Sequence, residues 1–568
     1  MGNEATKQIR ACFRVALGFS VATLLSACVP SETTSTSQQR PVVAAEMPAP
    51  ILASALASAS PTVQHARLKK DRFQYRAARS TVRAGLKGIA LRYINFVEMD
   101  ELALDGLRGL ATIDPAFQLV LEDGMIRVNL DEDNIADFAR PLSRDPADWA
   151  RLTTEIVRAG RNRSPEFQEA DNERIYEALF DGMLAGLDIF SRYSGADEAR
   201  ANRARRDGFG GIGIRFTKAE NAILVTHVQD GGPAHGAGLR PGDLILKINK
   251  DATGGLSLRK TAQRLRGPVG SPLTLSIARL NSDVEQPDRH ISFNLKRAHI
   301  VPETVRASVK GDVLKLTVTG FNKNTAPSMH AILSENDAAF HNGKLSGVVM
   351  DLRGNPGGLL SQSVDVADLF LNRGRIIATR GRHPDSFHDY RAGGGDLIDG
   401  KPLIVLVDGD SASAAEIVAS ALQDLGRAVV VGSSSYGKGT VQTVIRLPND
   451  GEMTLTWSRL VSPSGYALHG LGVMPAVCAT NTPAGDTQAI LAPAHIDSQL
   501  EAMSAWRAAG MIFDGRRPQL RDSCPAKTFQ AGKNGDLLMQ LARQVIHDPS
   551  LYRRALLLTE PINTASRH

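Results

Sequence analysis

The sequence lacks any group of His, Cys and Asp residues with the spacing of a metal site, so no metal or other cofactor is expected. It also lacks a stripe of Lys and Arg with interleaved aromatic residues, which argues against nucleic acid as a partner. Hydrophobic residues make up 42% and charged residues 22%, an ordinary balance for a soluble protein. A chain of 568 residues exceeds what one core organises, so three or four domains are expected.

The N-terminus carries an apolar run that is too short to cross a membrane. Val15 to Leu25 is about 11 residues long, whereas a spanning helix needs about 20. Basic residues precede this run, so residues 1–27 are expected to be a cleaved export signal, whose loss lowers the net charge from +6 to about +4. Leu25 to Cys28 resembles the bacterial lipobox, which implies that Cys28 is lipidated and anchors the chain to a membrane on the periplasmic side. The alternative is an ordinary signal peptide with an incidental cysteine.

Cysteine is scarce, with 4 residues in the whole chain. Cys12 lies in the expected leader and Cys28 would carry lipid, which leaves Cys478 and Cys524. In an oxidising compartment these two either form one disulfide or remain as two free buried thiols.

Changes in composition divide the chain into segments. Residues 28–65 are rich in Ser, Thr, Ala, Pro and Gln and cannot bury enough apolar surface to fold, so they predict a disordered tether. Helix formers with 3.6-residue spacing predict a helical N-terminal region at 66–205. Short strands punctuated by glycine occupy 206–298, and buried strands alternating with helices occupy 299–477. Residues 478–568 form an extension whose pattern says little.

The stretch GSSSYGKGT, residues 432 to 440, allows two uses of Lys438. Its glycine and lysine spacing satisfies most of a phosphate-binding loop. Such a loop needs Ser or Thr after the lysine and opens a helix, whereas Gly439 follows here. Beyond it, β-branched and polar residues alternate around a turn at Asn449 to Gly451, which predicts a hairpin. The pattern therefore favours proton chemistry over nucleotide binding.

The stretch VDGDSASAAEIVASALQ places Ser413 where a buried strand turns into the N-terminus of a helix. Backbone N–H groups there can stabilise an oxyanion, although Ser411 and Ser413 also suit simple helix caps. A lysine acts as a general base only if its pKa falls from about 10.4 towards 7 or 8, which an apolar cleft can achieve. Ser–Lys pairs can replace Ser–His–Asp. DLRGNPGG, residues 351–358, either presents N–H groups to a substrate carbonyl or is a tight turn.

In their order, the stretches GFGGIGIRF, GGPAHGAGLRPGDLILKIN, DLRGNPGG, GDSASAAEI and YGKGTVQ resemble the carboxy-terminal processing proteases, also called tail-specific proteases. The resemblance covers roughly residues 165 to 477. It implies that Ser413 is the nucleophile, Lys438 the general base and Gln442 the residue that positions the lysine. The oxyanion hole that it implies uses N–H groups from Ala414 and from a glycine of the pair Gly357 and Gly358.

The same resemblance assigns a PDZ-like domain to residues 206–298. Backbone N–H groups of Gly211, Ile212, Gly213 and Ile214 are expected to bind a chain-terminal carboxylate. The strand that follows offers an edge to the peptide, and side chains then decide which apolar C-terminal residue fits. A PDZ fold without peptide binding is the alternative.

The sequence thus predicts a multidomain α+β protein with a helical N-terminal region, a PDZ-like β-rich domain and an α/β Ser–Lys protease core. Its expected function is that of a serine endopeptidase of the bacterial cell envelope that cleaves proteins with apolar C-terminal tails. A non-catalytic PDZ scaffold lipoprotein is the rival, and its mark would be a missing serine or lysine. Ala415 and Ala476 depart from the family pattern at positions that are not expected to be catalytic. The natural substrate, the oligomeric state and the need for an activator protein stay open.

Overall fold

The computed structural model describes residues 73–279, 289–480, 486–510, 515–529 and 536–557. These residues belong to one compact unit, 71–568, and every contact below lies within it. The expected signal peptide, the lipidation site at Cys28 and the tether lie outside the described residues. Among the helices that are described, none combines the length and the apolar character needed to cross a membrane.

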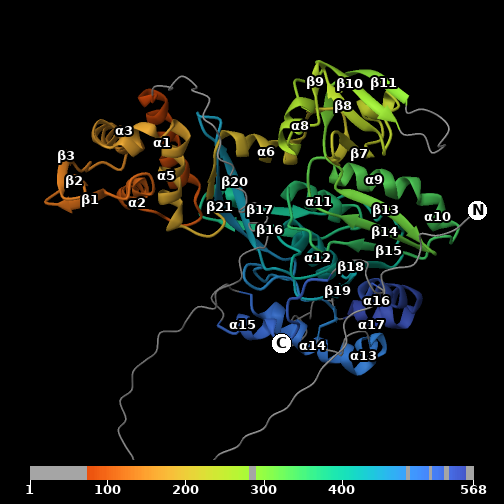
Figure 1. Ribbon diagram of the computed structural model, residues 1–568. Coiled ribbons are helices and arrows are strands. Elements are labelled where there is room, and N and C mark those ends of the chain that lie inside the picture. The colour runs from red at the N-terminus through yellow and green to blue at the C-terminus, as the bar shows by residue number, and fades with distance from the viewer. Residues whose placement is uncertain (1–72, 280–288, 481–485, 511–514, 530–535, 558–568) are drawn as a thin grey trace, which may run out of the picture. The chain divides into compact units, whose positions relative to one another are not determined.

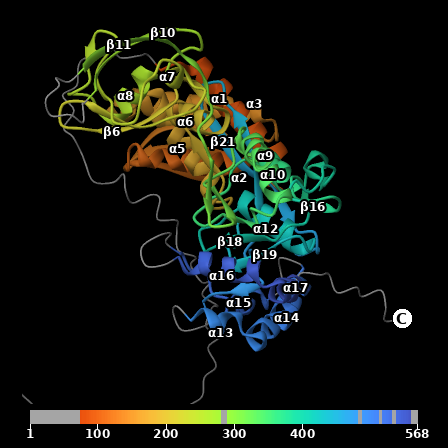
Figure 2. The ribbon, with the colours of Figure 1, turned by 90° about the vertical axis from the view of Figure 1, so that its right-hand side faces the viewer.

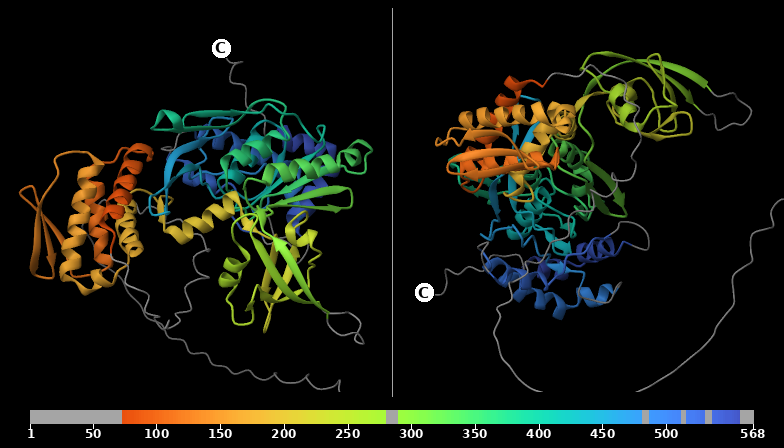
Figure 3. Two further views of the ribbon diagram at one scale, coloured as in Figure 1. Left: turned by 90° about the horizontal axis from the view of Figure 1, so that it is seen from above. Right: turned by 60° about the vertical axis from the view of Figure 1, so that its left-hand side comes forward.

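The N-terminal region is mainly helical. Its helices are α1 (Tyr75–Arg92), α2 (Met99–Gly109), α3 (Pro146–Arg163), α4 (Pro165–Glu169), α5 (Asn172–Ala185) and α6 (Ala196–Asp207). The prediction of helix throughout misses an antiparallel sheet of β1 (Phe117–Glu122), β2 (Met125–Leu130) and β3 (Asp133–Ala139), drawn in orange in Figure 3. Asp123 and Gly124 form its first turn with φ of 47° and 76°. An Asp-Gly pair is a strong hairpin signal, so the sequence did contain the information.

The PDZ-like domain is built on a sheet in the order β11-β10-β8-β7-β6. The strands are β6 (Ile214–Lys218), β7 (Ile223–Val228), β8 (Leu244–Ile248), β10 (Pro272–Arg279) and β11 (Arg289–Lys296), with α7 (Pro233–Gly236) and α8 (Leu258–Leu265) beside them. Strand β6 stands at the edge of this sheet. β5 (Phe209–Gly211) pairs with β12 (Ala298–Ile300), which brings the two ends of the domain together.

The protease core is a six-stranded sheet in the order β13-β14-β15-β18-β19-β22. The strands are β13 (Val305–Lys310), β14 (Val313–Val318), β15 (Gly347–Asp351), β18 (Leu403–Val407), β19 (Val429–Gly432) and β22 (Val477–Cys478). All pairings are parallel except that of β13 with β14. One face packs against α9 (Thr325–Glu335), α11 (Leu360–Asp368) and α12 (Ala414–Asp424). Strands buried on both faces explain the continuous apolar runs in the sequence.

The C-terminal extension is part of this core. α16 (Leu537–His547) and α17 (Pro549–Leu557) cover the second face of the sheet, beside β18 and β19 in Figures 1 and 2. Leu538, Leu541 and Val545 are completely buried there. Between them and β22 the chain forms α13 (Thr487–Leu491), α14 (Pro493–Ala508) and α15 (Arg517–Arg521). A disulfide joins Cys478 to Cys524, which is one of the two states expected for these cysteines.

The hairpin expected after Lys438 is confirmed. β20 (Thr440–Arg446) pairs antiparallel with β21 (Glu452–Val461), and this structure excludes the helix that a phosphate-binding loop would open. The sheet also contains β16 (Arg375–Gly381), β17 (His388–Arg391) and β4 (Arg192–Ser194). Because β4 pairs with β21, a short strand of the N-terminal region is held next to the lysine.

Candidate active site

Ser413 stands at the N-cap of α12, directly after the loop that follows β18. Its backbone has φ of 55° and ψ of −112°, a conformation that residues with a side chain rarely adopt. Such strain is typical of functional sites, because the surrounding structure must hold the residue in place. The side chain is half-buried, at the start of a helix whose N–H groups favour negative charge.

Ser411, the other candidate cap, has a structural role. Its hydroxyl donates to Leu352 O at 2.9 Å and lies 3.1 Å from Asp408 Oδ1. Asp408 Oδ1 also accepts from the N–H of Gly354 at 2.9 Å. Ser411 is fully buried by these contacts, so it connects the nucleophile loop to the glycine turn.

The glycine turn, residues 354–358, lies against Ser413. A Cβ on Gly357 would come within 2.8 Å of Ser413 Cβ and 3.0 Å of Ala414 N. The N–H of Gly357 donates to Asn355 Oδ1 at 2.9 Å, so it is already used. In the described part of the chain, no hydrogen bond uses the N–H of Ala414 or of Gly358. Of the two predicted glycines, Gly358 is therefore better suited to bind an oxyanion together with Ala414.

Lys438 lies in a turn between β19 and β20, packed against an aromatic ring. Its Nζ is 5.1 Å from the ring centroid of Phe190. Burial lowers the pKa of the Lys438 ammonium below its usual value of 10.5, and the positive charge of Arg192 lowers it further. Glu416 and Asp188 act in the opposite direction. The net lowering of the pKa makes the neutral amine accessible, as a general base requires.

The residues around Lys438 come from the N-terminal region, which the sequence pattern alone did not connect to the site. Asp188 Oδ1 accepts from the N–H of Phe190 at 2.8 Å and from Thr456 Oγ1 of β21 at 2.9 Å. Arg192 follows in β4. The turn at Asp188 thus fixes the ring of Phe190 beside the amine.

Glu416 links the serine and lysine segments and was missed by sequence reasoning. Its Oε2 accepts from the N–H of Ser413 at 2.7 Å and from the N–H of Lys438 at 2.9 Å. Its Oε1 accepts from Ser435 Oγ at 2.5 Å and from the N–H of Gly437 at 2.7 Å. Burial raises the pKa of Glu416, while these hydrogen bonds and the charge of Arg521 oppose that rise. Glutamate three residues after an N-cap serine is a capping-box spacing, a signal that could have identified it.

Gln442 lies in β20, where its amide nitrogen donates to Thr440 Oγ1 at 2.8 Å. This contact holds the side chain of Gln442 against Thr440, two residues after Lys438. Its role in orienting the lysine stays a prediction. No group of His, Cys, Asp or Glu in the described residues has an arrangement that could hold a metal ion.

The predicted tail-binding residues form the turn that leads from β5 into edge strand β6. The carbonyls of Ile212 and Gly213 accept from the N–H groups of Ala234 at 3.0 Å and Gln229 at 2.8 Å. Among the described residues, no hydrogen bond uses the N–H of Ile212 or of Gly213. These N–H groups therefore have no partner within the described residues, as the predicted carboxylate site requires. Gly211 pairs with Ala298.

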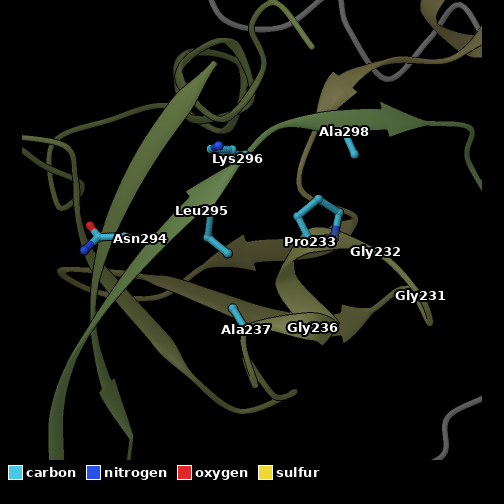
Figure 4. A pocket seen from close by; sticks show the side chains of 9 residues that line it. All are labelled: Gly231, Gly232, Pro233, Gly236, Ala237, Asn294, Leu295, Lys296 and Ala298. Atoms are coloured by element: carbon cyan, nitrogen blue, oxygen red, sulfur yellow. The ribbon is translucent and has the colours of Figure 1, made fainter. Parts of the chain in front are cut away.

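A pocket of about 460 Å³ lies on the PDZ-like domain, between α7 and β11. Figure 4 shows Pro233, Ala237 and Leu295 around it. Its lining includes none of the four residues expected to bind a peptide carboxylate, but it adjoins them, because Ala298 of the lining pairs with Gly211.

Known protein families match the two parts that carry these sites. Peptidase family S41 matches residues 312–478, and the PDZ domain family matches residues 210–290. The carboxy-terminal-processing protease of Bartonella bacilliformis is 40% identical over 306 residues, which are 54% of this chain and 69% of that protein. A probable CtpA-like serine protease of Staphylococcus aureus is 30% identical over 319 residues, which are 55% of this chain and 62% of that protein.

Among solved structures, the photosystem II D1 C-terminal processing protease is similar with 24% identity and a TM-score of 0.32, covering 66% of this chain and 92% of its own. The sequence matches cover both the PDZ-like domain and the protease core. The chain therefore belongs to peptidase family S41, as a serine-type carboxy-terminal-processing protease with a PDZ domain.

Proposed function

We propose that this protease cuts by a Ser–Lys mechanism, with Ser413 as the nucleophile and Lys438 as the general base. The observation that carries the proposal is the state of the lysine: its amine lies against Phe190 with a lowered pKa, and its backbone shares a carboxylate with that of Ser413. A neutral amine can accept the proton of a serine hydroxyl, and the shared carboxylate of Glu416 holds the two segments together.

In the proposed reaction, Ser413 Oγ attacks the scissile carbonyl and transfers its proton to Lys438. The N–H groups of Ala414 and Gly358 bind the oxyanion that forms. Lys438 then gives the proton to the leaving amine, and the peptide C–N bond breaks to leave an acyl-enzyme. A water molecule, deprotonated by the same lysine, hydrolyses the ester and restores Ser413.

Substrates of the proposed enzyme are proteins with apolar C-terminal tails. The available N–H groups of Ile212 and Gly213 support carboxylate capture, and edge strand β6 offers unpaired backbone to an extended tail. We further propose that the enzyme acts on the periplasmic side of the bacterial envelope, anchored by lipid at Cys28. The leader and lipobox of the sequence support this location.

The proposal is tested with an unfolded reporter that ends in an apolar residue. Wild-type protein is compared with Ser413→Ala and Lys438→Ala, and fragments are identified by mass spectrometry. We expect fragments from the wild type alone, with tail binding retained by both variants. Cleavage by Lys438→Ala at the wild-type rate would rule out the Ser–Lys pair. If neither wild type nor variants cleave but all bind the tail, the scaffold alternative replaces the proposal.

A further inference from the structure

The C-terminal strap, which we define as residues 515–529, contacts the loop that carries Lys438. From α15, Arg521 donates through Nη2 to Ser435 O at 3.0 Å and through Nη1 to Leu471 O at 2.5 Å. The same guanidinium lies so close to Gly437 that a Cβ there would be 3.3 Å from Nη1. Arg521 therefore fixes the backbone directly before the lysine.

The strap also contacts the loop that carries Ser413. Lys527 O accepts from the N–H of Gly409 at 3.0 Å and from Ser433 Oγ at 2.9 Å. Thr528 Oγ1 donates to Asp410 Oδ2 at 2.9 Å. One short segment thus connects the nucleophile loop to the lysine loop, and it lies outside the part of the chain that matches family S41.

Arg521 acts on the site through charge as well as through hydrogen bonds. Its positive charge lowers the pKa of Glu416, whose burial pushes that pKa upward. Glu416 in return raises the pKa of Arg521, which burial lowers. An ionised Glu416 is the stronger acceptor for the N–H groups of Ser413 and Lys438. Arg521 thereby favours the ionised form on which the geometry of both residues depends.

We propose that Arg521 is a positioning residue for the cleavage reaction and that the disulfide Cys478–Cys524 holds it in place. The inference rests on the proposed Ser–Lys function, because Arg521 acts through Glu416 and the loop of Lys438. Cys524 follows Arg521 by three residues, and its partner Cys478 ends β22 in the core sheet. Reduction of this disulfide removes the covalent link between the strap and the sheet, so we expect full activity to require the oxidised protein.

The first test compares Arg521→Ala, Arg521→Lys and Arg554→Ala in the full mature chain. Arg554→Ala is the matched control, because it removes an exposed ion pair with Asp497 in the same extension. We expect Arg521→Ala to lower kcat about 10- to 100-fold, in line with the loss of charge-assisted hydrogen bonds. KM and binding of an apolar-tailed peptide stay unchanged, because the PDZ-like domain is not altered. Arg521→Lys restores part of kcat, and Arg554→Ala retains all of it.

A second test leaves Arg521 intact and removes its anchor. We expect dithiothreitol, or the double change of Cys478 and Cys524 to serine, to lower kcat at least about tenfold while the PDZ-like domain still binds its peptide. Reoxidation should restore the kcat of the reduced wild-type enzyme, but not that of the double serine variant. This test decides the role of the disulfide even if Arg521→Ala does not fold, and Arg521→Lys then tests the role of Arg521.

The outcomes separate this inference from the proposed function. Wild-type cleavage by Ser413→Ala would refute the Ser–Lys mechanism itself. If Ser413→Ala is inactive but folded Arg521→Ala keeps the wild-type kcat, the mechanism stands and the positioning role of Arg521 is wrong. Unchanged kcat after complete reduction, shown by thiol titration, would refute the role of the disulfide.

Discussion

Ser413 and Lys438 donate their backbone N–H groups to the same atom, Oε2 of Glu416, at 2.7 and 2.9 Å. The two residues are 25 positions apart in sequence and lie on different loops. A single buried oxygen therefore sets the position of the proposed nucleophile relative to the proposed base. Any change in the charge or acceptor capacity of Glu416 acts on both residues together.

Glu416→Gln is expected to impair both stability and turnover. An amide offers one acceptor oxygen where the carboxylate offers two, so two of the four donors lose their partner. We expect the free energy of unfolding to fall by about 2–4 kcal/mol and kcat to fall about 100-fold, because misplaced catalytic groups lose their alignment. Urea unfolding and steady-state kinetics measure the two effects.

Asp424→Asn is the control for that change. Asp424 is a buried carboxylate at the other end of α12 and accepts from Ser464 Oγ at 2.7 Å. The Asp424→Asn substitution should lower the free energy of unfolding while kcat is retained. An equal loss of kcat in both variants would mean that Glu416 acts only through the stability of α12.

Two substitutions of Ser413 should separate catalysis from strain. Both Ser413→Ala and Ser413→Gly remove the hydroxyl and abolish cleavage, but only glycine adopts φ of 55° with ψ of −112° without strain. We expect Ser413→Gly to exceed Ser413→Ala in free energy of unfolding by about 1 kcal/mol, because relief of strain outweighs the added chain entropy. Equal stability in urea would show that the surrounding loop, and not Ser413, determines this conformation.

Gly357→Ala should block the active site, whereas the same substitution at Gly354 should be tolerated. The new Cβ would lie 2.8 Å from Ser413 Cβ, and Gly357 has φ of 97°. Displacement of Ser413 and of the N–H groups beside it is expected to lower kcat about 100-fold.

Gly354→Ala provides the comparison, since Gly354 also has a positive φ but no atom within 4 Å of the added Cβ. It should cost about 1 kcal/mol of stability, with little change in kcat. Cleavage rates that fall equally in the two alanine variants would contradict a specific role for the contact with Ser413.

The pH dependence of cleavage should respond to Arg192. A general base must be unprotonated, so kcat/KM rises with pH through the pKa of Lys438, which burial and Arg192 hold below 10.5. Arg192→Gln removes a positive charge, which makes the protonated lysine easier to form and raises its pKa. The acid limb of the kcat/KM profile should therefore move to higher pH.

Arg200→Gln serves as the control, because it removes an exposed arginine of the neighbouring helix α6 that pairs with Asp197. The acid limb of the kcat/KM profile of Arg200→Gln should coincide with that of the wild type. A profile of Arg192→Gln that also coincides would show that another group limits the rate.

The sequence was sufficient to select candidate residues that lie in contiguous motifs, although their catalytic roles stay proposals. Ser413 and Lys438 could be selected because a strand-to-helix turn and a glycine-flanked lysine each have a local pattern. The hairpin of β20 and β21 followed from residue alternation and its turn. These are features that depend on neighbours in sequence, where propensity and periodicity act directly.

The partners of those residues could not be found in the same way. Phe190 precedes Lys438 by almost 250 positions and Arg521 follows it by about 80, so only tertiary packing brings them together. The extension also seemed uninformative, although Leu538, Leu541 and Val545 have the spacing of a buried helix face. Nothing in that pattern indicates which sheet the face covers.

The late position of α16 and α17 in the chain has a consequence for synthesis. Strands β13 to β19 are complete by residue 432, but the helical residues that cover their second face lie between Ile490 and Ala555. A growing chain therefore presents these apolar strands uncovered until the helices that pack on them have been made. The order of translation itself delays the closing of the core until well after Ser413 and Lys438 have been made.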